Sequence, residues 1–135
     1  MFTLSLLKHK RVLKRAFSEC FSPIKDEIGN VPVLMQTSKL INASILGICR
    51  GYGESRILYE PHFDLVVDSV FEEVFRRESV EVQTRTESWL TSSDEEFLFH
   101  YYQAKYRAKD SSDLTWLQNI AIQYFRPAHT VVFPL

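Results

Sequence analysis

Residues 61–78 read PHFDLVVDSVFEEVFRRE and contain the clearest helical pattern in the chain. Apolar side chains recur at helical spacing and cover about half of the helix circumference. Three acids, Asp64, Asp68 and Glu72, follow at intervals of four residues beside the apolar face and are expected to face water. Pro61 suits a first helical turn. The segment therefore predicts a core helix with these buried side chains: Phe63, Val66, Val67, Val70, Phe71, Val74 and Phe75.

Two more helices are predicted before this one. Residues 4–21 have a helical pattern, and residues 22–30 then contain the breakers Pro23 and Gly29. The second predicted helix starts near Pro32, because proline suits a first turn, and runs to about Cys49. The apolar face of the first helix consists of Leu6, Leu13, Phe17, Cys20 and Phe21.

The stretch GICRGYG, residues 47–53, holds three of the four glycines. A phosphate-binding loop of the Walker type would end in Gly-Lys-Ser/Thr, which is absent here. We therefore interpret Gly51 as a helix-ending residue with positive φ, followed by a turn. Gly47 lies inside the predicted helix, where glycine costs about 1 kcal/mol, and close packing against a neighbouring helix is the simplest reason for it.

The second half of the chain alternates between helical and turn signals. Residues 80–86, VEVQTRT, alternate with period two and allow a short strand. The segment TSSDEEF offers two capping boxes, and a helix over residues 93–109 follows. A last helix runs through Phe125 and is capped by one of two residues in the preceding DSSD stretch, Ser112 or Asp113.

Length and composition agree with a mainly α-helical fold. The chain has 135 residues, with 45% hydrophobic and 24% charged residues, which suits a single helical domain over residues 1–135. About five helices joined by short connections predict a compact bundle or an irregular helical fold. A short β element is allowed near residues 80–86 or 130–134. No apolar run approaches the roughly 20 residues of a membrane span.

A basic patch distinguishes the first helix from the rest of the chain. Residues 1–18 contain no acid, although the whole chain has a net charge of −1. Such a patch suits nucleic-acid phosphate, an anionic membrane surface or an acidic protein, or it is a solvated helix face that offsets the acidic remainder. The patch consists of Lys8, Lys10, Arg11, Lys14 and Arg15.

The helix predicted over residues 93–109 carries apolar side chains on two sides. One strip consists of Phe97, Tyr101, Ala104 and Ala108, and the other of Leu98, Phe99, Tyr102 and Tyr106. A helix of this kind is either central in its own fold or shared with a partner, which is either another protein or a second copy of the chain. Tyrosine and tryptophan are enriched at interfaces. The predicted partner-binding residues are Tyr101, Tyr102, Tyr106 and Trp116.

No catalytic or metal-binding constellation is evident in the sequence. Its four histidines fall in separate elements, and two cysteines are too few for a cysteine-rich site. We predict no catalytic residue, no metal and no cofactor. The remaining nucleophile hypothesis pairs Cys20 or Cys49 with a histidine. Free thiols are typical of a reducing compartment, so a cytoplasmic location is predicted.

The leading functional hypothesis is a small helical protein that acts by protein–protein interaction, with a homodimer as one form. Adaptors, chaperones, and immunity or antitoxin proteins belong to this class. The alternative is a nucleic-acid-binding protein that uses the basic N-terminal helix. A second alternative is an enzyme or small-ligand binder whose site is not visible in the sequence.

Overall fold

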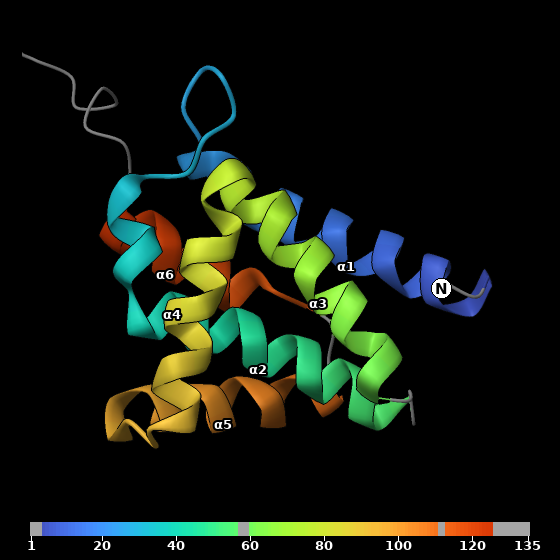
Figure 1. Cartoon of the computed structure of the whole chain (residues 1–135). Coiled ribbons are helices and arrows are strands. Elements are labelled where there is room, and N and C mark those ends of the chain that lie inside the picture. Colours follow the sequence, from blue (N-terminus) through green and yellow to red (C-terminus); the bar gives the residue numbers. More distant parts are fainter. Residues whose placement is uncertain (1–3, 57–59, 111–112, 126–135) are drawn as a thin grey trace, which may run out of the picture.

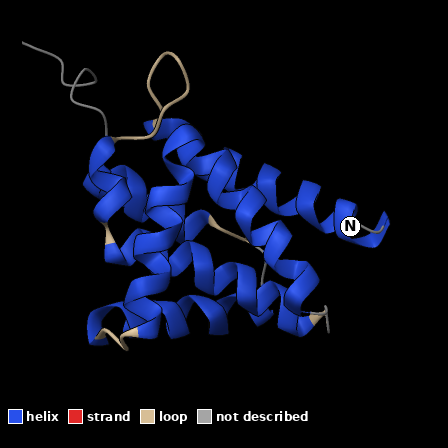
Figure 2. Cartoon of the chain, in the orientation of Figure 1, coloured by secondary structure: helices blue, strands red, loops and turns tan. Residues whose placement is uncertain are grey.

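The computed structural model describes residues 4–56, 60–110 and 113–125, which form six α-helices (Figure 1). Figure 2 shows that helices dominate and that these ranges contain no strand. The mainly α-helical prediction is confirmed. The α-helices are α1 (Leu4–Phe21), α2 (Lys39–Ser55), α3 (Glu60–Phe75), α4 (Ser79–Thr91), α5 (Glu95–Asp110) and α6 (Thr115–Phe125). Short 3-10 segments are η1 (Ser22–Ile24), η2 (Val33–Thr37) and η3 (Arg76–Glu78).

The helices pack as two main pairs with two further helices across them. α1 lies along α3, and α2 lies along α5, which occupies one edge of the molecule (Figure 1). α4 crosses between α3 and the start of α5, and α6 packs against α1 and α2. Consequently α5 has a close helical neighbour on its inner side, which is α2.

The predicted core face of α3 is confirmed. All seven apolar side chains of that face are buried, and Val66, Val70 and Phe71 are fully covered. The acids Asp64 and Asp68 are exposed, as expected. The predicted face of α1 is also confirmed, because its five apolar side chains are all buried. These two faces pack against each other and form much of the hydrophobic core.

The second helix differs from the prediction at both ends. The segment after Pro32 is a 3-10 turn, and α2 begins at Lys39, where the Ser38 hydroxyl accepts a hydrogen bond from the Ile41 amide at 3.1 Å. The predicted end at Cys49 is wrong, because α2 continues to Ser55. Gly51 lacks the predicted positive φ, which among the described glycines occurs at Gly29, in the loop after α1.

The predicted strand at residues 80–86 is wrong, since this segment lies within α4. Over so few residues, apolar and polar side chains can alternate even in a helix. Here Ser79, Val82 and Thr86 are buried at helical spacing. Thr86 also donates its hydroxyl to the carbonyl of Val82, four residues earlier, as threonine does in helices. The other β candidate, residues 130–134, lies outside the described residues.

The caps of the last two helices are aspartates. Asp94 accepts the Phe97 amide at 3.0 Å, so the capping boxes predicted at Ser92 and Ser93 are wrong. Asp113 accepts both the amide and the hydroxyl of Thr115, which confirms Asp113 as the polar residue at the start of α6. Its predicted alternative, Ser112, lies outside the described residues.

Candidate functional site

The glycines of α2 hold α5 in place by allowing the two backbones to approach closely. A Cβ atom on Gly47 would collide with the carbonyl oxygen of Tyr101, and one on Gly51 with the carbonyl oxygen of Lys105. Small residues of α5 face the glycines, since Ala104 and Ala108 lie 3.0 Å from those Cβ positions. The packing reason expected for Gly47 is therefore confirmed, and it extends to Gly51.

Ion pairs at both ends of this contact fix the register of α2 and α5. Lys39 binds Asp94 at 2.8 Å near the start of both helices, and Lys105 binds Glu54 at 2.7 Å near the end. The two helices therefore run parallel. The hydrogen bond from Lys105 holds the pKa of Glu54 below its ordinary value, and the same bond raises the pKa of Lys105.

The inner strip of α5 is part of the core. Phe97 and Ala104 are fully buried, and Tyr101 is only 6% exposed. Burial also raises the pKa of the Tyr101 hydroxyl. Phe97 stacks on Tyr101 at a ring-centroid distance of 6.1 Å and meets Trp89 of α4 at 5.9 Å. Tyr101, which the sequence nominates as a partner-binding residue, thus belongs to the core, although its ring meets that of the exposed Tyr102 at a centroid distance of 5.1 Å.

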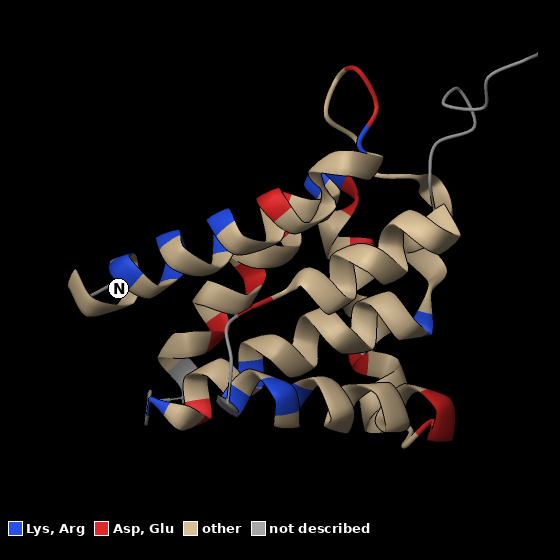
Figure 3. Ribbon diagram, turned by 180° about the vertical axis from the view of Figure 1, so that it is seen from behind, with Lys and Arg blue, Asp and Glu red and all other residues tan. Residues whose placement is uncertain are grey.

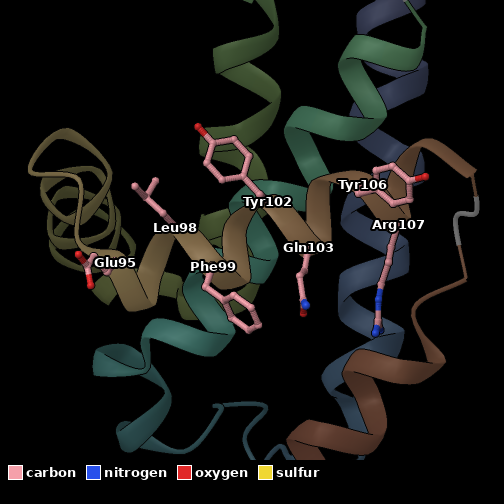
Figure 4. A pocket seen from close by; sticks show the side chains of 7 residues that line it. All are labelled: Glu95, Leu98, Phe99, Tyr102, Gln103, Tyr106 and Arg107. Carbon is pink, nitrogen blue, oxygen red and sulfur yellow. The ribbon is translucent and has the colours of Figure 1, made fainter.

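The outer strip of α5 is defined here as Leu98, Phe99, Tyr102 and Tyr106. Phe99 is 60% exposed, Tyr102 57% and Tyr106 71%, and Leu98 is half-buried. Figure 4 shows these side chains standing along one stretch of helix, beside a shallow groove that they line together with Gln103. Leu98 packs partly against the core, while the three aromatic side chains of the strip stay exposed in the described part of the chain.

Opposite charges lie at the two ends of the outer strip. Glu95 stands at the start of α5 and Arg107 near its end (Figure 4), and both are exposed. Neither side chain forms an ion pair with another described residue. The guanidinium of Arg107 instead lies over the ring of Trp116 in α6, 4.4 Å from its centroid. Trp116 is half-buried and adjoins the strip through this contact.

The basic residues recur along the length of α1 (Figure 3). Lys8, Arg11 and Arg15 are exposed, while Lys10 and Lys14 are partly covered. A shallow groove runs along the last four of these residues and ends at Glu19 and Glu73. Both acids pair with the patch, because Arg15 binds Glu19 at 3.0 Å and Lys14 lies 4.0 Å from Glu73. The patch is thus partly neutralised at its C-terminal end.

The cysteines do not provide an activated nucleophile. Both are free and buried, and burial raises the pKa of each thiol to about 12, so the reactive thiolate is strongly disfavoured. A hydrogen bond of 2.7 Å joins Nδ1 of His9 to the hydroxyl of Tyr52. Desolvation lowers the pKa of His9. The hypothesis of a cysteine–histidine pair therefore loses its chemical basis.

Two further features are absent from residues 4–56, 60–110 and 113–125. These residues contain no group of three or more His, Cys, Asp or Glu side chains arranged to hold a metal ion. Nor do they contain a helix that is both long enough and apolar enough to cross a membrane.

Sequence reasoning separated the two strips of α5 but missed the residues that complete the outer one. The sequence pattern places Phe99 and Leu98 on the second strip without marking them as partner-binding residues. Glu95 and Arg107 were overlooked because they fall outside the apolar pattern. Both line the groove beside the strip, and this placement is visible only in the folded molecule.

Comparison of the chain with protein-family models, with curated proteins and with solved structures finds no match in any of the three.

Proposed function

We propose that this protein acts by binding another protein through the outer strip of α5. The observation that supports the proposal is the exposure of Phe99, Tyr102 and Tyr106 on a helix whose opposite side is already buried. Exposed apolar side chains are ordinary when scattered, but a contiguous aromatic strip with polar ends is typical of a binding surface.

The chemistry of the strip suits a protein partner. Tyrosine offers a large rigid ring and a polar tip, so Tyr102 and Tyr106 can each bury apolar area while their hydroxyls keep a hydrogen bond. Aromatic residues of this kind supply much of the binding energy at protein interfaces. Because the packing with α2 holds α5 rigidly, the strip would lose little conformational entropy on binding.

Among the binding proteins, adaptors, chaperones and immunity or antitoxin proteins remain the proposed classes. A cytoplasmic location is part of the same proposal, and the free state of Cys20 and Cys49 supports it. No catalytic residue, metal or cofactor is needed for this function.

The experiment is co-purification from the native cell with a tagged chain, followed by mass spectrometry. Three chains are compared: the wild type, Tyr102→Ala, and the matched surface control Val80→Ala, which removes an exposed apolar side chain from α4. The proposal predicts that Tyr102→Ala loses a protein that both other chains retain. Identical sets of bound proteins for all three chains would contradict it.

A second candidate function is nucleic-acid binding by the basic patch of α1. It is favoured by the recurrence of five cations along one helix (Figure 3), three of which, Lys8, Arg11 and Arg15, are exposed. Phosphate contacts release counterions, so the affinity would fall steeply as salt rises. Absence of any retardation of DNA or RNA at about 50 mM salt would remove this candidate.

A further inference from the structure

We infer that the exposed face of α1 docks on an anionic lipid surface. The inference goes beyond the proposed protein-binding function, because it concerns a different helix and a different partner. The observation behind it is that exposed apolar side chains stand among the exposed bases of α1. Leu4 is 87% exposed and Val12 43%, and they share this helix with Lys8, Arg11 and Arg15.

Helical spacing places Leu4 and the three exposed bases in one stripe. They follow one another at intervals of four, three and four residues, so they lie on one side of the helix. The opposite side is the buried face that packs into the core. From Leu4 to Arg15 the stripe is roughly 17 Å long. Because it is straight and lies opposite the core, a flat surface can reach all of its side chains together.

Further apolar side chains flank the stripe. Val12 lies four residues after Lys8, and Leu7 lies four residues before Arg11, so each adjoins a base of the stripe. Leu7 is half-buried and lines the shallow groove along the basic patch. Anionic headgroups attract the bases, and apolar side chains beside those bases can enter the boundary between headgroups and acyl chains.

A nucleic acid would make less use of this face. Phosphate contacts need the bases alone, so Leu4 and Val12 would gain no apolar partner from them. A helix inside a groove of DNA also has phosphates on several sides, whereas the groove along α1 is lined on one side by Glu73 of α3. A lipid surface approaches from one side only. The stripe on that side contains no acid, since residues 1–18 have none.

Co-sedimentation of the full chain with vesicles tests the docking. The chain should bind vesicles that contain phosphatidylglycerol and should not bind vesicles of phosphatidylcholine alone, because the attraction depends on anionic headgroups. Raising the salt from about 50 mM to about 500 mM should release most of the bound protein. Equal binding to both kinds of vesicle, or no binding to the anionic vesicles at about 50 mM salt, would overturn the inference.

A charge reversal on the stripe tests the contribution of the bases. Arg11→Glu should weaken binding to the anionic vesicles about tenfold, because it replaces an attraction with a repulsion. Arg77→Glu reverses an exposed arginine of η3 and is the matched control, which should bind like the wild type. Equal losses in the two variants would show that net charge alone matters and that α1 is not the docking face.

Removal of an apolar side chain separates a lipid surface from a nucleic acid. Leu4→Ser keeps the charge of the chain and should weaken vesicle binding about fivefold, because less apolar area leaves water. Val80→Ser removes an exposed apolar side chain from α4 and should have no effect. Wild-type binding by Leu4→Ser would overturn the inference. Retardation of DNA without any vesicle binding would also overturn it and would leave the second candidate function in its place.

A polarity-sensitive fluorophore tests which face meets the lipid. The native thiols of Cys20 and Cys49 are buried, so the thiol of Val12→Cys can be labelled selectively in the folded chain. Its emission should shift to the blue on anionic vesicles, whereas a label on Val80→Cys should not respond. The reverse pattern would show that another face docks. Tyr102→Ala should bind vesicles like the wild type, so the co-purification judges the proposed function separately.

Discussion

The two sides of α5 carry similar side chains but have opposite surroundings. The inner strip combines Phe97 and Tyr101 with two alanines and lies against the glycines of α2. In the outer strip, Phe99, Tyr102 and Tyr106 are exposed. Aromatic content therefore does not distinguish a core face from a binding face in this helix.

What distinguishes the two sides is the presence of small residues at helical spacing. Ala104 and Ala108 bring α5 close to Gly47 and Gly51, so the backbones themselves are in contact. No such small residues interrupt the outer strip, where large rings project from the surface. A partner for that side would pack against rings rather than against backbone.

Truncation of matched phenylalanines should show the largest difference between the two strips. Phe97→Ala should reduce the free energy of unfolding by about 3–5 kcal/mol, because it leaves a cavity beside Trp89 and Tyr101. Phe99→Ala, two residues away on the outer side, should change it by about 0.5 kcal/mol or less in the monomer. Urea denaturation of the two variants measures both values, and equal losses would show that the strips are wrongly assigned.

A methyl group at Gly47 tests the close approach on the inner side. Helix propensity alone predicts that Gly47→Ala stabilises the protein by about 1 kcal/mol. The collision with the Tyr101 carbonyl predicts a net loss of about 1–3 kcal/mol instead. Gly53→Ala is the control, because its Cβ would lie 3.1 Å from the ring of Phe63, a milder contact than a collision with backbone, and should cost less. Thermal stabilisation of Gly47→Ala would show that the helices do not touch there.

The ion pair between α2 and α5 should give a smaller, pH-dependent effect. Lys105 holds the pKa of Glu54 below the ordinary value of 4.5, so the pair stabilises the folded state above that pH and loses its effect as the pH falls below it. Glu54 is about half exposed, which limits the effect to less than about 1 kcal/mol. The stability difference between wild type and Glu54→Gln should therefore shrink between about pH 6 and pH 3, and a constant difference would contradict this assignment.

The helices with one strong apolar face were predictable from the sequence. The faces of α1 and α3 repeat at helical spacing over four or more turns, so the core residues and the segment boundaries followed within a few residues. The outer strip of α5 was recognisable for the same reason. Its exposure was not, since the sequence does not say which of two apolar strips is covered.

The errors arise where a tertiary contact overrides a local preference. Gly51 is a helix-ending residue by local preference, yet packing against Lys105 and Ala108 keeps it inside α2. The VEVQTRT segment alternates locally, yet Val82 and Thr86 are buried on one face of α4. The contact of Arg107 with the Trp116 ring joins α5 to α6, and which helices meet in this way is known only from the folded molecule.

The most direct test of the account is hydroxyl-radical footprinting of α5, read by mass spectrometry at single residues. It compares the adjacent tyrosines Tyr101 and Tyr102 in the dilute chain, in the concentrated chain and in the complex recovered by co-purification. The account predicts that Tyr101 is protected in every sample, whereas Tyr102 is modified in the dilute chain and protected once the chain is bound. Equal modification of Tyr102 in all three samples would contradict the claim that the outer strip of α5 is a protein-binding surface.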